Sequence, residues 1–151
     1  PMPTGFMYLV AVMDWFSRFV LAWEVSNSMD TDFCLRALND AFSFGKPYIF
    51  NSDQGSQFTS ELFTQRLLDR QILISMDGRG RYLDNIFIER LWRTVKYDEV
   101  YMHRHETVPA LIAGLEQYFQ RYCYRRPHQS LGNCTPAEVY FTCKGLARPI
   151  Y

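Results

Sequence analysis

The chain has 151 residues, of which 48% are hydrophobic and 17% are aromatic. This length and composition exclude intrinsic disorder and predict one domain that is large enough to bury a core. No apolar run is long enough to cross a bilayer and the first residues are unlike a signal peptide, so we expect a cytoplasmic protein without membrane contact. The four cysteines are scattered without a Cys-x-x-Cys pair, which indicates reduced thiols and no disulfide or zinc framework.

Charge is unevenly distributed along the chain, although the formal net charge is zero. Residues 1–78 carry five Lys/Arg and nine Asp/Glu, a balance of −4, whereas residues 79–151 carry eleven and seven, a balance of +4. An acidic site beside a basic surface suits a metal-dependent enzyme that acts on a polyanion. A chance distribution of surface charges is the alternative explanation.

The first half of the chain alternates between predicted strands and helices. Residues 6–13 are almost wholly apolar, as in a strand buried on both faces, and residues 19–25 predict a second strand that forms an antiparallel hairpin with the first. The next expected elements are a helix from about residue 30 to 44, a strand at 48–50, a helix at 61–70 and a strand at 72–74. This order predicts a mixed α/β sheet.

The second half of the chain is predicted to be mainly helical. Its expected elements are a loop at 75–82, a helix at about 85–97, a helix at 108–122 and a last short helix from Pro136 to Tyr140. His103 and His105 are two residues apart and could contribute to a metal site, although the sequence offers no second close pair of ligands.

Polar residues follow directly after the short strand at 48–50. Asp53 comes at its carboxyl end, where open α/β sheets bind ligands, and Gly55 would let a backbone or a phosphate approach closely. Taken alone, this stretch is equally consistent with a strand-to-helix turn in which Asp53 accepts hydrogen bonds from nearby backbone amides.

A second carboxylate, Glu89, lies on the predicted helix at 85–97, with thirty-five residues between it and Asp53. One side of this helix is apolar, with Ile86, Ile88 and Leu91. The other side carries Asn85, Glu89, Arg93 and Lys96. For Arg93 and Lys96, an ordinary solvated helix face is the alternative to a ligand-binding function.

Four ordered motifs resemble the DDE transposases and retroviral-type integrases, and within that superfamily most of all the insertion-sequence transposases of the IS3 family. The motifs are residues 51–60, 84–89 and 91–96, and the tail residues 126–132 with 135–139. The resemblance covers essentially the whole chain. It implies a ribonuclease H-like fold, with residues 1–122 as the integrase catalytic core and residues 123–151 as its basic C-terminal tail.

The resemblance also implies an activity, that of a transposase catalytic core. Such a polynucleotidyl transferase cleaves DNA and transfers its strands in DNA integration, transposition and recombination. The implied cofactor is Mg²⁺, with Mn²⁺ as a substitute and no small-molecule cofactor, and the implied partners are insertion-element ends, target DNA and further copies of the chain. Two cations about 3.5–4 Å apart serve the attacking and leaving oxygens of an in-line displacement at phosphorus.

The family's functional residues can be carried over position by position. Asp53 and Glu89 are expected to be catalytic and to bind the metal, because Mg²⁺ takes hard oxygen ligands. The residues expected to contact DNA are Gln54, Ser56, Gln57, Arg79, Arg81, Arg93 and Lys96.

One element of the family pattern is missing from this sequence. The first catalytic Asp of the family lies on a strand before the one at 6–13, so we expect a core without its first strand and without one of three metal ligands. Asp14 is expected to be structural, accepting backbone amides or pairing with Arg18, with metal binding as the alternative. Two other functions therefore stay open: a catalytically impaired core that only binds DNA or assembles, and a ribonuclease H-like nuclease that only hydrolyses.

Overall fold

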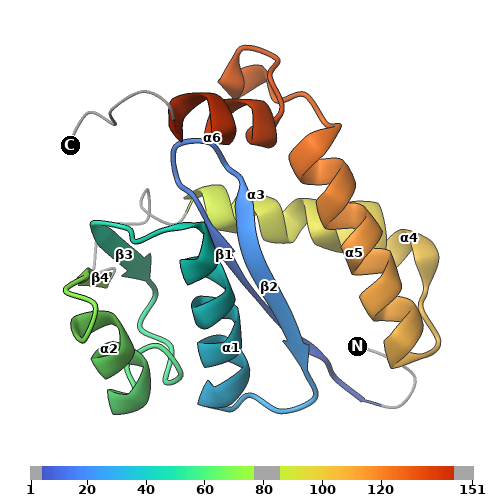
Figure 1. Ribbon diagram of the computed structural model, residues 1–151. Helices are drawn as coiled ribbons and strands as arrows, with labels where there is room; N and C mark the ends of the chain where they lie inside the picture. Colours follow the sequence, from blue (N-terminus) through green and yellow to red (C-terminus); the bar gives the residue numbers. More distant parts are fainter. Residues whose placement is uncertain (1–4, 77–85, 145–151) are drawn as a thin grey trace. The chain divides into compact units, whose positions relative to one another are not determined.

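The computed structural model describes residues 5–76 and 86–144 (Figure 1). The elements before the gap are β1 (Tyr8–Met13), β2 (Val20–Ser26), α1 (Thr31–Ala41), the 3₁₀-helix η1 (Phe42–Phe44), β3 (Ile49–Ser52), α2 (Glu61–Leu68) and β4 (Leu73–Met76). Those after it are α3 (Ile86–Val95), the π-helix η2 (Lys96–Val100), α4 (Tyr101–His103), α5 (Val108–Tyr124), the 3₁₀-helix η3 (Gln129–Leu131) and α6 (Pro136–Lys144). The predicted order of strands and helices is confirmed, with ends that differ by a few residues.

The chain divides into two compact units. The first comprises Pro1–Val12 and Leu21–Trp92, and the second comprises Met13–Val20 and Arg93–Tyr151. Candidate residues Asp53 and Glu89 both belong to the first unit.

The strands form two small sheets. β1 pairs with β2, and β3 pairs with β4 in a parallel ladder that sets Ile49 opposite Leu73 and Ser52 opposite Met76. The mixed α/β class is confirmed, but no ladder joins the two pairs within the described residues. The apolar pattern of a strand records its burial and not its hydrogen-bonding neighbour, which is why the sequence predicted a single sheet.

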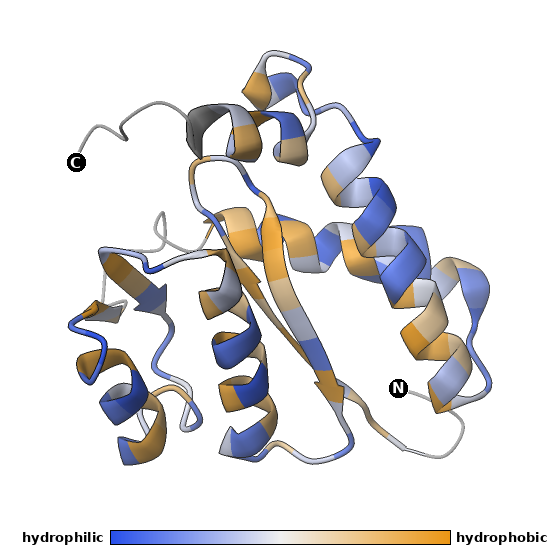
Figure 2. Ribbon diagram, viewed as in Figure 1, coloured by the Kyte–Doolittle hydropathy of each residue, from blue (hydrophilic) through white to orange (hydrophobic). Residues whose placement is uncertain are grey.

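The core of the first unit lies between α1, α2 and the strands. α1 begins at Asp30, whose carboxylate caps the helix by accepting from the Phe33 amide, and α2 begins at Ser60, which accepts from the Phe63 amide. The buried core residues are Val10, Phe33, Cys34, Ala37, Leu38, Phe63, Leu67 and Ile72. Figure 2 shows that β1 and β2 are largely apolar along their length, whereas α1 alternates between polar and apolar residues, as expected for a helix that buries one face.

The turn between β1 and β2 belongs to the second unit and is fixed by Asp14. Its Oδ2 accepts hydrogen bonds from the backbone amide of Ser17 at 2.9 Å and from the Ser17 hydroxyl at 2.6 Å. The backbone amide of Asp14 donates to the Phe19 carbonyl at 2.8 Å and closes the hairpin. The predicted structural role of Asp14 is therefore confirmed.

Aromatic residues make up much of the core of the second unit. The Phe19 ring stacks on Tyr140 of α6 at 4.9 Å, and α5 buries Leu115, Tyr118 and Phe119. In the part of the chain that the structure describes, no helix combines the length and apolar character needed to span a bilayer.

Candidate active site

Asp53 lies immediately after β3, at the carboxyl end of the strand. Its side chain is exposed to solvent, and its Oδ1 accepts a hydrogen bond from the backbone amide of Gly55 at 2.8 Å. The alternative in which Asp53 accepts hydrogen bonds from nearby backbone amides is thus observed in part, because one of its oxygens bonds to such an amide. That same bond fixes the direction of an exposed carboxylate, as metal or phosphate chemistry would require.

Gly55 leaves room for side-chain oxygen atoms in this turn. A Cβ atom at this position would lie 2.9 Å from Asp53 Oδ1 and 3.0 Å from Gln57 Oε1. The Gly55 carbonyl also accepts the backbone amides of Phe58 and Thr59, each at 3.0 Å, so the turn is tightly closed. Side chains of the turn thus lie close to Gly55, and the approach of a backbone or a phosphate at this position stays a prediction.

Two buried oxygen atoms precede Asp53 on β3. Asn51 Oδ1 and Ser52 Oγ have no hydrogen-bond partner among the described residues. A buried polar atom without a partner costs about 1–3 kcal/mol, so such atoms usually meet a water, an ion or another group. Successive side chains of a strand point to opposite faces, so only Asn51 shares the side of Asp53, and its oxygen is of the type that a hard cation takes.

Glu89 lies in the first turn of α3 and its side chain is exposed. The same helix buries Leu91 and Val95. An exposed carboxylate opposite a buried apolar face is what the periodicity predicted, and Glu89 is free of the hydrophobic packing that would have prevented it from holding a cation.

The predicted DNA-contacting residues are polar and mostly exposed where the structure describes them. Gln54, Ser56, Arg93 and Lys96 are exposed, and Gln57 is half-buried. Arg79 and Arg81 lie outside the described residues.

The buried cysteines contribute no nucleophile. Burial, together with the charges of Asp30 and Asp53, raises the pKa of Cys34 to about 11. Burial likewise raises the pKa of Cys123 to about 11. Both thiols are therefore protonated at neutral pH and are poor nucleophiles.

The tail motifs stabilise the second unit. The Arg126 guanidinium pairs with Asp98 through Nη1 and Oδ2 at 2.7 Å, and the His128 ring packs edge-on against Tyr122 at 4.9 Å. Thr135 and Glu138 form a capping box at the start of α6: Glu138 Oε2 accepts from the Thr135 amide at 2.7 Å, and Thr135 Oγ1 accepts from the Glu138 amide at 3.2 Å.

Solved structures show which fold the chain has. The chain superposes on the catalytic core of BIV integrase with a TM-score of 0.74 at 18% identity, covering 92% of this chain and 88% of that one. It superposes on a chain of the simian T-cell lymphotropic virus intasome, solved in complex with PP2A regulatory subunit B56 gamma, with a TM-score of 0.80 at 15% identity, covering 99% and 54%. The fold is that of a retroviral integrase catalytic core, which confirms the predicted ribonuclease H-like class.

The sequence comparisons then show the family. The Integrase core domain model matches residues 1–81, and a second model of the same description matches residues 70–136. The chain therefore belongs to the integrase core domain family. This family is dependent on divalent metal ions, and the predicted resemblance to transposase and integrase cores is confirmed.

The curated relatives are insertion-sequence transposases. The transposase for insertion sequence element IS629 of Shigella sonnei is 32% identical over 141 residues, which are 89% of this chain and 46% of the relative. The putative transposase InsK for element IS150 of Escherichia coli (strain K12) is 27% identical over 135 residues, which are 87% of this chain and 48% of the relative. The chain thus spans about half the length of these two relatives.

Proposed function

We propose that this chain is the catalytic core of a transposase that cleaves DNA at the ends of an insertion element and transfers the cut strand to target DNA. The observation that carries the proposal is the exposed Asp53 carboxylate, which the Gly55 amide holds at the carboxyl end of β3 in a chain of the integrase core family. The relatives that match most of the chain are transposases by name, which supports the same activity.

The donor atoms of this region fit Mg²⁺, with Mn²⁺ as its substitute. Asp53 and Glu89 would hold the metal through carboxylate oxygens, the ligands that Mg²⁺ prefers. The buried Asn51 Oδ1 on β3 has no partner among the described residues and would offer a further oxygen on that side of the strand. When bound, the metal supplies charge stabilisation at the attacking and leaving oxygens of the phosphodiester. An HTLV-2 integrase core that shares the fold was solved in complex with magnesium, which supports this choice.

Polar residues that follow the two carboxylates in the chain would position the DNA. Gln54, Ser56 and Gln57 follow Asp53 in the same turn and can donate to phosphate oxygens. Arg93 and Lys96, exposed on and after α3, would neutralise phosphates, as would Arg79 and Arg81. Phosphate contacts carry no base sequence, so the choice of element ends would belong to other parts of the full protein.

We propose that the full reaction is carried out by a protein as long as these relatives, with more than one copy assembled together. The family resemblance implies three carboxylates at the metal, of which this chain offers Asp53 and Glu89. An intasome among the structural neighbours supports assembly of several copies on DNA ends. The free thiols of Cys34 and Cys123 fit the reducing cytoplasm, where we place the protein.

A nicking and strand-transfer assay tests the proposal, run with Mg²⁺ and with Mn²⁺ on this chain and on a protein of the relatives' length. We expect Asp53→Asn and Glu89→Gln each to lower the rate at least about a hundredfold, because each removes an anionic ligand of the metal without changing side-chain size. The matched control is Glu116→Gln, an exposed carboxylate on α5, which should retain the activity.

The possible outcomes separate the three functions. Full activity in Asp53→Asn would overturn the proposal. DNA binding without any cleavage, even in the longer protein with Mn²⁺, would instead support a binding or assembly module. Hydrolysis without strand transfer would support a ribonuclease H-like nuclease.

A further inference from the structure

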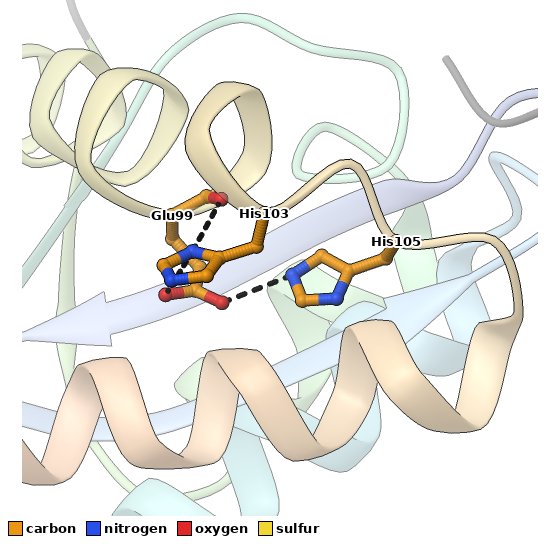
Figure 3. Close-up of side chains that lie close together, drawn as sticks. All are labelled: Glu99, His103 and His105. Atoms are coloured by element: carbon orange, nitrogen blue, oxygen red, sulfur yellow. Dashed lines mark hydrogen bonds and ion pairs between the residues drawn. The ribbon is translucent and has the colours of Figure 1, made fainter.

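Three potential metal ligands converge in the second unit, around Glu99 of η2. His105 Nε2 lies 3.0 Å from Glu99 Oε1, and His103 Nδ1 lies 3.4 Å from Glu99 Oε2. Figure 3 shows the two imidazole rings directed at the same carboxylate. One ligand atom from each of the three residues lies within 4.8 Å of the others. The two histidines are close in the sequence, whereas the carboxylate that completes the cluster is identified only by the fold.

The backbone is shaped to bring these side chains together. The π-helical turn η2 carries Glu99, and such turns shift the direction of the side chains that follow. Arg104, between the two histidines, adopts a left-handed conformation with φ 41°, which reverses the chain after α4. A non-glycine residue in this conformation is strained, and such strain gathers at ligand-binding sites.

The cluster is enclosed on one side and open on the other. The side chains of Glu99 and His105 are 6% and 12% exposed, whereas that of His103 is 52% exposed. Gly114 of α5 closes the inner side: a Cβ atom there would lie 2.3 Å from Glu99 Oε1 and 2.5 Å from His105 Cε1. Glycine at this position therefore lets the α5 backbone approach the cluster, and the open side would admit a water ligand.

We propose that Glu99, His103 and His105 bind one transition-metal ion of the Zn²⁺ class. Two imidazoles and a carboxylate are the donor set that Zn²⁺ takes when it keeps an open position, and imidazole favours Zn²⁺ over Mg²⁺. Zn²⁺ with bonds of about 2.0–2.1 Å holds neighbouring tetrahedral ligands about 3.3 Å apart. His105 and His103 lie near that spacing, at 3.0 Å from Glu99 Oε1 and 3.4 Å from Glu99 Oε2, and the three ligand atoms lie within 4.8 Å of one another, so small side-chain rotations would close the site.

Without the ion, the same atoms form hydrogen bonds. The Glu99 carboxylate then accepts from His105, and the Glu99 carbonyl oxygen lies 3.1 Å from His103 Nδ1. Binding requires each coordinating ring nitrogen to give up its proton, either to the other nitrogen of the ring or to solvent. Protons and the metal ion therefore compete for these ring nitrogens, and a binding experiment must show whether the metal displaces the protons.

Zn²⁺ titration by calorimetry tests this inference, using metal-stripped protein in excess Mg²⁺. We expect one ion per chain, with His103→Ala and His105→Ala each weakening binding more than about tenfold, since even outer-shell changes commonly cost that much. The matched control is Glu106→Gln, an exposed carboxylate next to His105, which should bind as the parent does. Co²⁺ substitution should give tetrahedral d–d bands without thiolate charge transfer, which excludes binding at the exposed Cys134.

Several results would overturn the inference. These results are the absence of a tight Zn²⁺ site, a Zn²⁺ affinity of His103→Ala equal to that of the parent, and a thiolate charge-transfer band with Co²⁺. His103 is exposed, so its variant decides the matter even if the more buried His105→Ala loses structure by circular dichroism. Asp53→Asn should leave the Zn²⁺ affinity unchanged, so a failure here is distinguishable from a failure of the proposed DNA chemistry.

Discussion

Asp53 and Gly55 depend on each other within a single turn. The Gly55 amide bonds to Asp53 Oδ1, and the missing side chain of Gly55 leaves the space that this oxygen and Gln57 Oε1 occupy. Glycine at position 55 therefore matters more for the placement of the carboxylate than for the stability of the fold, because the atoms nearest to an added Cβ are mainly the ends of side chains.

Gly55→Ala should displace the Asp53 carboxylate. The new methyl group would lie 2.9 Å from Asp53 Oδ1, so the carboxylate must move, and a displacement of about 1 Å costs on the order of a hundredfold in rate. We expect that loss in strand transfer, with the melting temperature nearly unchanged. An active variant would show that the turn tolerates alanine without displacing the carboxylate. A variant that unfolds would show that the fold itself requires the glycine.

His128 makes the second unit sensitive to acid. Burial lowers the pKa of His128 below its ordinary value of 6.5, and the Arg126 charge lowers it further. The unfolded chain therefore binds a proton more readily than the folded one, so stability is complete above about pH 6.5 and falls as the pH drops below it.

The melting temperature measured across this range tests the effect. We expect it to fall between about pH 7.5 and 5.5 in the parent protein, and to fall less in His128→Gln, which cannot be protonated. The slope is the relevant quantity, since His128→Gln also loses the ring contact with Tyr122 and should melt lower at every pH. Equal slopes in the two proteins would remove His128 as the cause.

Among the elements, α6 shows how a recognisable tail motif serves the fold. Thr135 precedes the helix and Glu138 follows three residues later, and each side chain bonds to the backbone amide of the other. These bonds satisfy amides that the first turn of a helix leaves without partners.

Thr135→Ala should lower the free energy of unfolding by about 1 kcal/mol, the usual cost of a lost helix cap. Chemical denaturation monitored by circular dichroism measures the change. Thr135→Ser is the control, because it keeps the capping oxygen and should lose much less. If both substitutions cost the same, the buried methyl group of Thr135 matters and the cap does not.

At the scale of the whole molecule, DNA affinity should depend on salt in proportion to the phosphates contacted. Each neutralised phosphate contributes a slope of about −0.9 to log affinity against log salt on duplex DNA. Arg93→Ala with Lys96→Ala should therefore reduce the slope by about 1.8 in fluorescence anisotropy titrations. Arg66→Ala, an exposed cation on α2, is the control and should leave the slope unchanged. An unchanged slope in the double variant would remove both residues from the DNA surface.

The sequence by itself determined what depends on neighbours along the chain. Local hydrogen bonding and apolar periodicity explain three features: the helix starts at Asp30 and Ser60, the exposed polar side of α3, and the position of Asp53 after a strand. The family motifs added the fold class, which the structural neighbours confirm.

Only the tertiary structure decided which distant parts meet. It separates β1–β2 from β3–β4 within the described residues, and it brings Gly114 of α5 against Glu99, fifteen positions earlier in the chain. The π-helical turn at Glu99 and the left-handed Arg104 leave no clear pattern in the residue types, because both conformations are strained locally and persist through the packing around them. Periodicity reports that a side chain is buried, whereas the identity of the atoms it meets is set by the path of the whole chain.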